Sequence, residues 1–291
     1  MKDSRTSSIV LHNLLIAVLA FIWLIPIIWL VCTSFSAYSG MNTSTFFPKE
    51  WSISNYMKLF HSDSVSQFPQ WFLNTFIIAC FTCVISTMFV LMVAYATSVM
   101  RFKMRKPLMN MAVILNLFPG MLAMIAVYFT LKSFNLTNSY AGLIMVYSAS
   151  SGLGYLIAKG FFDTVPRALC EAARIDGAGP ITVLLKVYLP ISLPALATVG
   201  LFAIVNHWND YFSGLIYMSK AEMYPLQTYI QQLTVDLTQI TDANQLKQLA
   251  SMNNRTFNAA KIVVSTIPLL VIYPFLQKYF VTGMVIGAVK E

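Results

Sequence analysis

Long apolar runs separated by polar segments dominate the chain. Six runs are long enough to cross a bilayer, because a helix rises 1.5 Å per residue and the hydrocarbon core is about 30 Å thick. Charged residues are concentrated between the runs. The pattern predicts an all-α integral membrane protein with six transmembrane helices, over residues 9–31, 72–100, 108–131, 140–159, 191–218 and 261–280.

Proline residues and polar loops divide this pattern further. Pro26 lies inside the first run, and Pro119 interrupts the third, so we expect a kink or break at each. Two loops stand out in the second part of the chain, a charged one at 161–190 and a longer external one. We divide the chain into residues 1–34 (N-terminal cytoplasmic segment and first helix), 35–70 (extracytoplasmic loop), 71–283 (a core of five transmembrane helices containing the charged loop 161–190 and the external loop 217–260) and 284–291 (cytoplasmic tail).

The composition agrees with a membrane protein. Of the 291 residues, 57% are hydrophobic and 10% are charged, and the mean hydropathy is +0.67. A water-soluble core could not bury that much apolar surface, so the lipid bilayer is the expected solvent. The net charge of +8 would also suit nucleic-acid binding, but the loops show no basic patch interleaved with aromatic residues. We therefore expect no nucleic-acid partner.

The distribution of positive charge predicts the topology. Six spans place both termini on one side of the membrane, and that side receives 12 of the 19 basic residues. Because short cytoplasmic loops collect Lys and Arg, we expect a multi-pass protein of the cell membrane with both termini in the cytoplasm. The 12 residues are Lys2, Arg5, Arg101, Lys103, Arg105, Lys106, Lys159, Arg167, Arg174, Lys186, Lys278 and Lys290.

The charged loop predicts a helix–turn–helix. Asp163 and Thr164 can cap a helix that begins near Pro166. Gly177 can end that helix, and Pro180 suits the first turn of the next one. We call this helix–turn–helix (residues 161–190) the elbow. Its position between two membrane spans suits it to docking on a water-soluble partner.

Charge spacing inside the first helix of the elbow predicts ion pairs. Arg167 and Glu171 are four residues apart, and Glu171 and Arg174 are three apart, so the three side chains share one face. An amphipathic helix lying on the membrane surface is the alternative. The helix has few large apolar residues, which disfavours membrane insertion.

The stretch 171–190, EAARIDGAGPITVLLKVYLP, resembles the "EAA" loop of binding-protein-dependent ABC importer permeases. Val187 stands where that family usually has Ile, a conservative difference. The end of the chain, 279–291, and the pair Trp208-Asn209 resemble the carbohydrate branch of the family, in particular the subunit like the maltose permease G protein. The matching loop residues are Glu171, Ala172, Ala173, Gly177, Tyr188, Leu189 and Pro190.

The resemblance implies a fold, partners and a site. The fold would be the type I (MetI-like) permease fold. The partners would be a homologous second permease subunit, a dimer of ATPase subunits that binds ATP and Mg, and an extracytoplasmic solute-binding protein that delivers a carbohydrate, in particular an oligosaccharide. This chain would itself be non-catalytic and hold no cofactor. In the family the loop forms a coupling helix in a cleft of the ATPase, which assigns that contact here to Glu171, Ala172, Ala173 and Gly177, flanked by Arg174 and Asp176.

A second polar cluster lies inside the fifth run. Polar side chains are costly in hydrocarbon and usually face a cavity or a partner, so the cluster is a candidate substrate pathway. An interfacial belt is the alternative, because Trp and Tyr gather at membrane surfaces. In a continuous helix Asn206 and Asp210 would share one face, and His207 and Tyr211 another. The cluster comprises Asn206, His207, Trp208, Asn209, Asp210 and Tyr211, and Asn116, Tyr147 and Ser150 are weaker pore-facing candidates.

Other functions remain open from the residues alone. Asp210 could be the titrating group of an ion-coupled carrier, and His207 with Asp210 could serve an intramembrane hydrolase, although spacing nominates no nucleophile. An ABC permease for another small solute would share the loop. Cys80 and Cys83 form a C-x-x-C, but their apolar setting disfavours the deprotonated thiols that a metal requires, so we expect packing residues.

Overall fold

The computed structural model describes residues 2–38, 45–61, 67–100, 102–150, 154–233 and 255–288. Within these ranges the chain is helical, and the only β pairing is an isolated bridge between Ser36 and Trp51. The all-α prediction is therefore confirmed. The chain divides into two compact units, one made of residues 1–69 and 232–267 and the other of residues 70–231 and 268–291.

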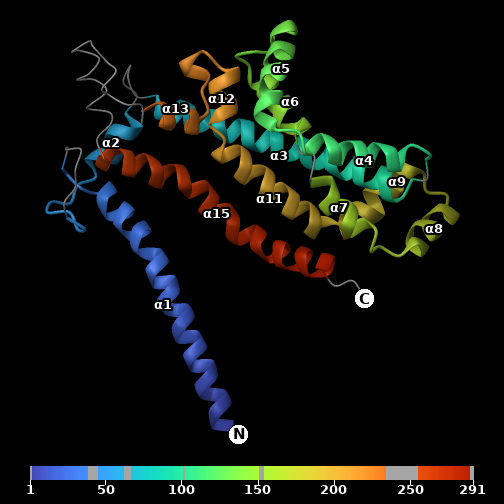
Figure 1. The fold of residues 1–291 in the computed structure, drawn as a ribbon, viewed down its shortest axis with the longest axis horizontal. Coiled ribbons are helices and arrows are strands. Elements are labelled where there is room, and N and C mark those ends of the chain that lie inside the picture. The colour runs from blue at the N-terminus through green and yellow to red at the C-terminus, as the bar shows by residue number, and fades with distance from the viewer. Residues whose placement is uncertain are drawn as a thin grey trace. The chain divides into compact units, whose positions relative to one another are not determined.

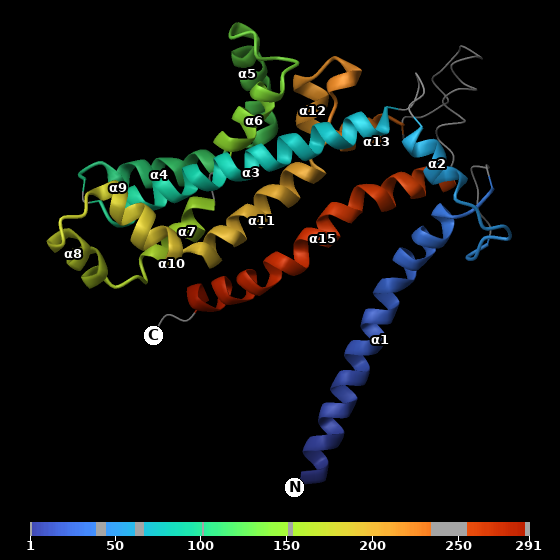
Figure 2. The ribbon, with the colours of Figure 1, turned by 180° about the vertical axis from the view of Figure 1, so that it is seen from behind.

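The first unit contains α1 (Lys2–Ser34), α2 (Ser54–Phe60) and the beginning of α15 (Arg255–Ala288). The end of α1 meets α2 and the start of α15 in both views (Figures 1 and 2). The Asn55 amide of α2 donates to the carbonyl oxygens of Ser34 and Ser36, at 3.0 and 2.9 Å. The hydroxyl of Thr256 donates to the Tyr38 carbonyl oxygen at 2.8 Å. These bonds fasten the three helix ends together.

Helix α15 begins earlier than the sequence suggested. It starts at Arg255 rather than near residue 261, and it continues through Pro268 and Pro274. Lys261, the first residue of the predicted span, therefore lies inside the helix: its side chain is 1% exposed, with its ammonium 4.3 Å from the centre of the Phe257 ring. Residues 234–254 of the predicted external loop lie outside the described residues.

The second unit is built on α3, which begins at the unit boundary, and on a series of shorter helices. These are α3 (Phe68–Ser98), α4 (Arg105–Asn116), α5 (Gly120–Ser133), α6 (Tyr140–Ala149), α7 (Gly154–Phe162), α8 (Arg167–Ile175), α9 (Pro180–Val183), the π-helix η1 (Leu184–Tyr188), α10 (Leu189–Ile191), α11 (Leu193–Asn209), α12 (Phe212–Tyr217), the 3₁₀-helix η2 (Ala221–Met223) and α13 (Leu226–Leu233). Helices α8 and α12 lie at opposite ends of this unit (Figures 1 and 2).

Straight and broken spans both occur. In the part of the chain that the structure describes, three stretches are long and apolar enough to cross a membrane alone, namely Ile9–Ser34, Phe68–Ser98 and Arg255–Phe275, and up to six spans result if each bent helix pair counts as one. Helices α4 and α5 meet at 103°, which confirms the break predicted at Pro119. The prediction of one continuous helix over 191–218 was wrong, because α11 ends at Asn209 and α12 begins at Phe212.

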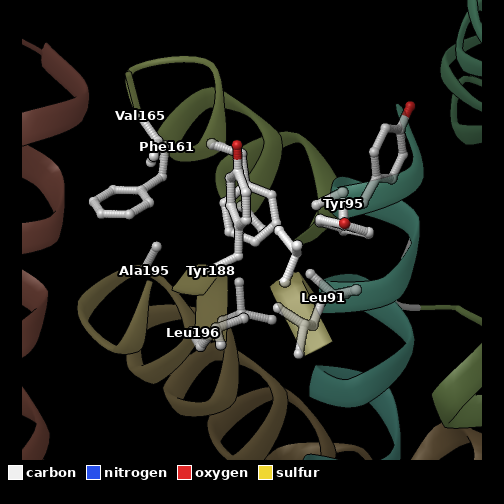
Figure 3. Packing of buried hydrophobic residues seen from close by; sticks show 14 of the residues in the cluster. Leu91, Tyr95, Phe161, Val165, Tyr188, Ala195 and Leu196 are labelled. Carbon is white, nitrogen blue, oxygen red and sulfur yellow. The ribbon is translucent and has the colours of Figure 1, made fainter. Parts of the chain in front are cut away.

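A hydrophobic cluster forms the core of the second unit beside α8. It brings together side chains of α3, α7, η1 and α11, including Leu91, Phe161 and Leu196 (Figure 3). The rings of Tyr95 and Tyr188 meet edge to face with centroids 5.3 Å apart. Such aromatic contacts add to the area buried. The elbow 161–190 therefore rests on a packed base.

Candidate functional site

The C-terminal end of α8 is a Schellman motif. The N–H of Ala178 donates to the carbonyl oxygen of Ala173 at 2.9 Å, and the N–H of Gly177 donates to that of Arg174 at 3.0 Å. Gly177 has φ +82°, in the left-handed region that glycine enters without steric cost. Helix α9 then begins at Pro180. Both predicted helix boundaries of the elbow are therefore confirmed.

The N-terminal end of α8 differs from the prediction. Helix α8 begins at Arg167 behind Pro166, and no side chain caps it. Asp163 pairs with Lys159 of α7, and the hydroxyl of Thr164 donates to the Phe161 carbonyl oxygen at 2.7 Å. The predicted cap by Asp163 and Thr164 was wrong because both side chains bond to residues of α7 instead.

Helix α8 has a buried and an exposed face. Cys170 is buried, and Ala173 is half-buried against the hydrophobic cluster, so Ala173 supports the elbow rather than presenting it to a partner. The other proposed coupling residues are exposed, namely Glu171, Ala172, Arg174, Asp176 and Gly177. The predicted ion pairs of Glu171 with Arg167 and Arg174 were wrong: within the described ranges no such pair comes within 4 Å. Exposed pairs of this kind gain little over hydration.

Apolar side chains at the tip of the elbow were missed from the sequence. Ile175, at the last position of α8, is 86% exposed, and Ile181 in α9 is 72% exposed. Leu169 on the first turn of α8 is also exposed. Large apolar groups beside charges are typical of protein–protein contact surfaces. The sequence could have indicated this exposure, because Ile175 and Ile181 flank the Asp176–Pro180 turn.

The elbow is connected to the spans by a hydrogen bond to α3 and by a continuous run of short helices. The hydroxyl of Tyr95 in α3 donates to the Pro180 carbonyl oxygen at 3.0 Å. From α9 the chain continues through η1 and α10 and then bends by 80° into α11. At the bend, the Ser192 hydroxyl donates to the carbonyl oxygen of Tyr188. A π-helix and a polar kink in one segment are features often found where a helix must adjust during function.

The second cluster contributes two side chains to a cavity whose lining is half polar and half apolar, called the polar cavity for its polar half. Asn206 and His207 line a cavity of about 270 Å³ together with Asn116 of α4, Ser150 and Ser86. The His207 ring stacks on Tyr147 with centroids 4.3 Å apart. The sequence thus nominated four residues of this wall, Asn116, Ser150, Asn206 and His207. It missed Ser86 because a single serine in an apolar run gives no distinctive pattern.

The other members of the cluster have structural contacts. Trp208 is 2% exposed and meets Phe72 edge to face, with centroids 5.6 Å apart. The Asn209 amide donates to the Val205 carbonyl oxygen of its own helix, and Tyr211 is exposed. None of these three lines the polar cavity. The proposal that all six residues share one pathway is therefore reduced to Asn206 and His207.

Asp210 holds the start of α12. One of its carboxylate oxygens accepts from the N–H groups of Phe212 and Ser213, at 2.9 and 3.2 Å, and the other accepts from the Ser213 hydroxyl at 2.5 Å. Its extended backbone (ψ 119°) leaves the helix, so Asp210 and Asn206 do not share a helical face. This is the geometry of a helix cap.

Two asparagines hold the segment that follows α12. The Asn138 side-chain oxygen accepts from the Ser219 hydroxyl at 2.9 Å and from the Lys220 N–H at 3.2 Å. The Asn74 amide of α3 donates to the carbonyl oxygens of Glu222 and Tyr224, at 2.8 and 3.0 Å. We call Asn74 and Asn138 the outer clamps.

Aromatic packing reinforces the outer clamps. The rings of Trp71 and Tyr229 stack with centroids 3.4 Å apart, and the Trp71 indole donates to the Ala221 carbonyl oxygen at 2.6 Å. Burial raises the pKa of the Tyr229 hydroxyl, so this ring is neutral at physiological pH. The segment 218–229 is therefore a fixed element of the second unit.

Comparison with known proteins identifies the family. Residues 91–286 match the family described as "Binding-protein-dependent transport system inner membrane component". The chain is 34% identical to Protein LplC of Bacillus subtilis, covering 92% of this chain and 90% of that one. It is 32% identical to the polygalacturonan/rhamnogalacturonan transport system permease protein YtcP of the same species, covering 93% and 94%.

A solved structure has the same fold. In the crystal structure of a bacterial ABC transporter involved in the import of the acidic polysaccharide alginate, one chain superposes with a TM-score of 0.79 at 29% identity, covering 93% of this chain and 95% of that one. The type I permease fold is thereby confirmed. The chain belongs to the binding-protein-dependent inner membrane components of transport systems, the non-catalytic, membrane-spanning permease subunits of ABC importers.

Proposed function

We propose that this chain imports an oligosaccharide as one of two homologous permease subunits, driven by a pair of ATPase subunits that bind ATP and Mg and supplied by an extracytoplasmic binding protein. The observation that carries the proposal is α8, an exposed helix with an apolar tip at Ile175 on a packed base. The five exposed coupling residues and Ile175 form the contact with the ATPase.

The coupling follows the chain. Movement of α8 reaches α11 through α9, η1 and α10, and α11 carries Asn206 and His207 in the cavity wall. ATP-driven closure of the ATPase pair displaces the elbow, and hydrolysis resets it. A ligand can shift a conformational equilibrium only by contacting its states differently, and ATP acts here through the ATPase contacts of α8. The bend at Ser192 is the place where the displacement changes direction.

The cavity suits a saccharide, and an acidic one in particular. Its polar lining consists of amides, hydroxyls and one imidazole, which hydrogen-bond to sugar hydroxyls, and no carboxylate lines it within the described residues. One relative is named for polygalacturonan/rhamnogalacturonan transport, and the similar solved structure is a transporter involved in the import of the acidic polysaccharide alginate. The cavity, with a volume of about 270 Å³, forms this subunit's side of the substrate path, and the second permease subunit supplies the other side.

The positive-inside bias supports a topology with both termini and α8 in the cytoplasm and with α12, η2 and α13 outside. An ion-coupled carrier based on Asp210 has less support, because both carboxylate oxygens already accept hydrogen bonds from the start of α12.

Uptake in proteoliposomes tests the proposal. The complete importer would be reconstituted with ATP trapped inside, and the binding protein with a labelled oligogalacturonide or a neutral maltooligosaccharide would be added outside. We expect ATP-dependent accumulation of the oligogalacturonide that survives an ionophore. Uptake without ATP that collapses with the ion gradient would refute it, and preference for the neutral sugar would refute the acidic substrate class.

A further inference from the structure

A cavity in the first unit has no role in the proposed transport path. It has a volume of about 420 Å³ and lies between the end of α1 and the start of α15. Both helices are candidate membrane spans. A volume of this size is within the range of small-molecule sites, about 300–1,000 Å³.

The polar end of the cavity carries one charge. Arg255, the first residue of α15, is the only charged residue among the described residues that line it. Its guanidinium lies 5.6 Å from the centre of the Trp29 ring, an interaction that holds the cation at the cavity. Thr33, whose side chain is 3% exposed, also lines the cavity. A guanidinium is a favourable partner for a phosphate.

The other end of the cavity is apolar. Ile262 of α15 lies seven positions after Arg255, which places it about 10 Å further along the helix. Leu30 of α1 lines the same cavity. Along α15 the lining therefore changes from a cation at the helix end to an aliphatic side chain, that of Ile262, deeper in the span. Trp29, one turn before the end of α1, marks the depth at which tryptophan gathers in membrane proteins, the headgroup region.

We propose that this cavity binds one glycerophospholipid, with its phosphate on the Arg255 guanidinium and the start of an acyl chain along Leu30 and Ile262. A single cation at headgroup depth above an aliphatic wall matches an anionic amphiphile. Neither a sugar nor a free phosphate would supply an apolar group to contact the aliphatic wall. In the topology proposed above, the lipid belongs to the outer leaflet.

Native mass spectrometry of the intact importer tests this site. The delipidated complex would be titrated with dioleoyl phosphatidylglycerol, with dioleoylglycerol as a lipid that lacks phosphate, and with inorganic phosphate. We expect one phosphatidylglycerol that binds about tenfold more weakly to Arg255→Gln, because the charge-assisted contact is lost. Lys132→Gln, which removes an exposed cation near the end of α5, is the matched control and should bind like the wild type.

A second variant distinguishes binding of the lipid headgroup from binding of the acyl chain. Ile262→Trp fills the deep end and should weaken phosphatidylglycerol and dioleoylglycerol alike, whereas Arg255→Gln should weaken only phosphatidylglycerol. Monodisperse elution of each variant verifies that it folds. Equal lipid binding by wild type and Arg255→Gln would overturn the proposal. Complete displacement of the lipid by inorganic phosphate, or no retained lipid in the wild type because a partner subunit covers the cavity, would overturn it as well.

Discussion

The side-chain amide of Asn74 lies 2.8 Å from the carbonyl oxygen of Glu222 and joins two segments 148 residues apart in the chain. Asn74 is fully buried, and its second amide hydrogen reaches Tyr224 at 3.0 Å. Its oxygen accepts from the Tyr140 hydroxyl at 2.7 Å and from Gln70 at 2.9 Å. Both donors and both acceptor positions are used, so this side chain links α3, α6 and the segment after α12.

Asn74→Asp should loosen the segment 221–229. The carboxylate would face two carbonyl oxygens to which Asn74 now donates, and a buried group left without its partner costs about 1–3 kcal/mol. We expect faster amide hydrogen exchange in this segment and a lower melting temperature. Tyr140→Phe, which removes only a donor to the Asn74 oxygen, should leave exchange in 221–229 almost unchanged. Similar exchange in the two variants would contradict the clamp.

Gly177→Ala should impair coupling. Alanine at φ +82° costs about 1–2 kcal/mol, although a Cβ there meets no atom within 4 Å, so the effect is conformational. Gly179→Ala is the matched control, because its φ of −73° suits any residue and its Cβ position is equally open. ATP-driven uptake at equal membrane abundance should fall for Gly177→Ala alone. A normal rate in that variant would show that the Schellman geometry is dispensable.

Asp210→Asn should retain uptake, whereas Asp210→Ala should reduce it. The asparagine oxygen can still accept from the N–H groups of Phe212 and Ser213, but alanine removes the cap at a cost of about 0.5–2 kcal/mol. Initial uptake rates and exchange protection of α12 measure the two effects. A carrier that titrates Asp210 would instead lose all coupled transport in Asp210→Asn.

Asn206→Leu and His207→Leu should weaken substrate passage. Each removes a polar group from the cavity wall, and loss of a hydrogen bond to substrate costs about 0.5–1.5 kcal/mol. We expect slower uptake with unchanged basal ATPase activity. Asn209→Leu, on the same helix but outside the cavity, should transport normally. Equal losses in all three variants would indicate general damage to α11 rather than a pathway.

Local signals in the sequence predicted the elbow well. Gly177 and Pro180 determine the helix boundaries through backbone geometry alone, and the break at Pro119 has the same origin. The orientation of α8 was not predictable in this way, because Cys170 and Ala173 face inward only through packing on side chains from distant segments. Charge spacing predicted ion pairs for Glu171 that are absent among the described residues, because exposed ion pairs gain little free energy over hydration of the separate charges.

Hydrophobic periodicity failed where a polar residue has a structural role. The run 191–218 is apolar enough for one helix, yet Asp210 ends α11 by capping α12. The same cap takes Asp210 and Tyr211 out of α11, whereas Trp208 and Asn209 lie on α11 but make other contacts, so only Asn206 and His207 of the six nominated residues reach the cavity. The outer clamps Asn74 and Asn138 were not found, because their partners in the segment after α12 lie 81 to 150 residues away in sequence.

Photo-crosslinking from the elbow tests the central claim most directly. A benzoylphenylalanine at Ile175, 86% exposed at the tip of α8, should capture the ATPase subunit in native membranes, with a yield that changes when ATP is added. The same probe at Ser133, an exposed position at the end of α5, should not capture it. If the probe at Ile175 captured only lipid, or if the probe at Ser133 captured the ATPase equally well, α8 would not be the surface that binds the ATPase.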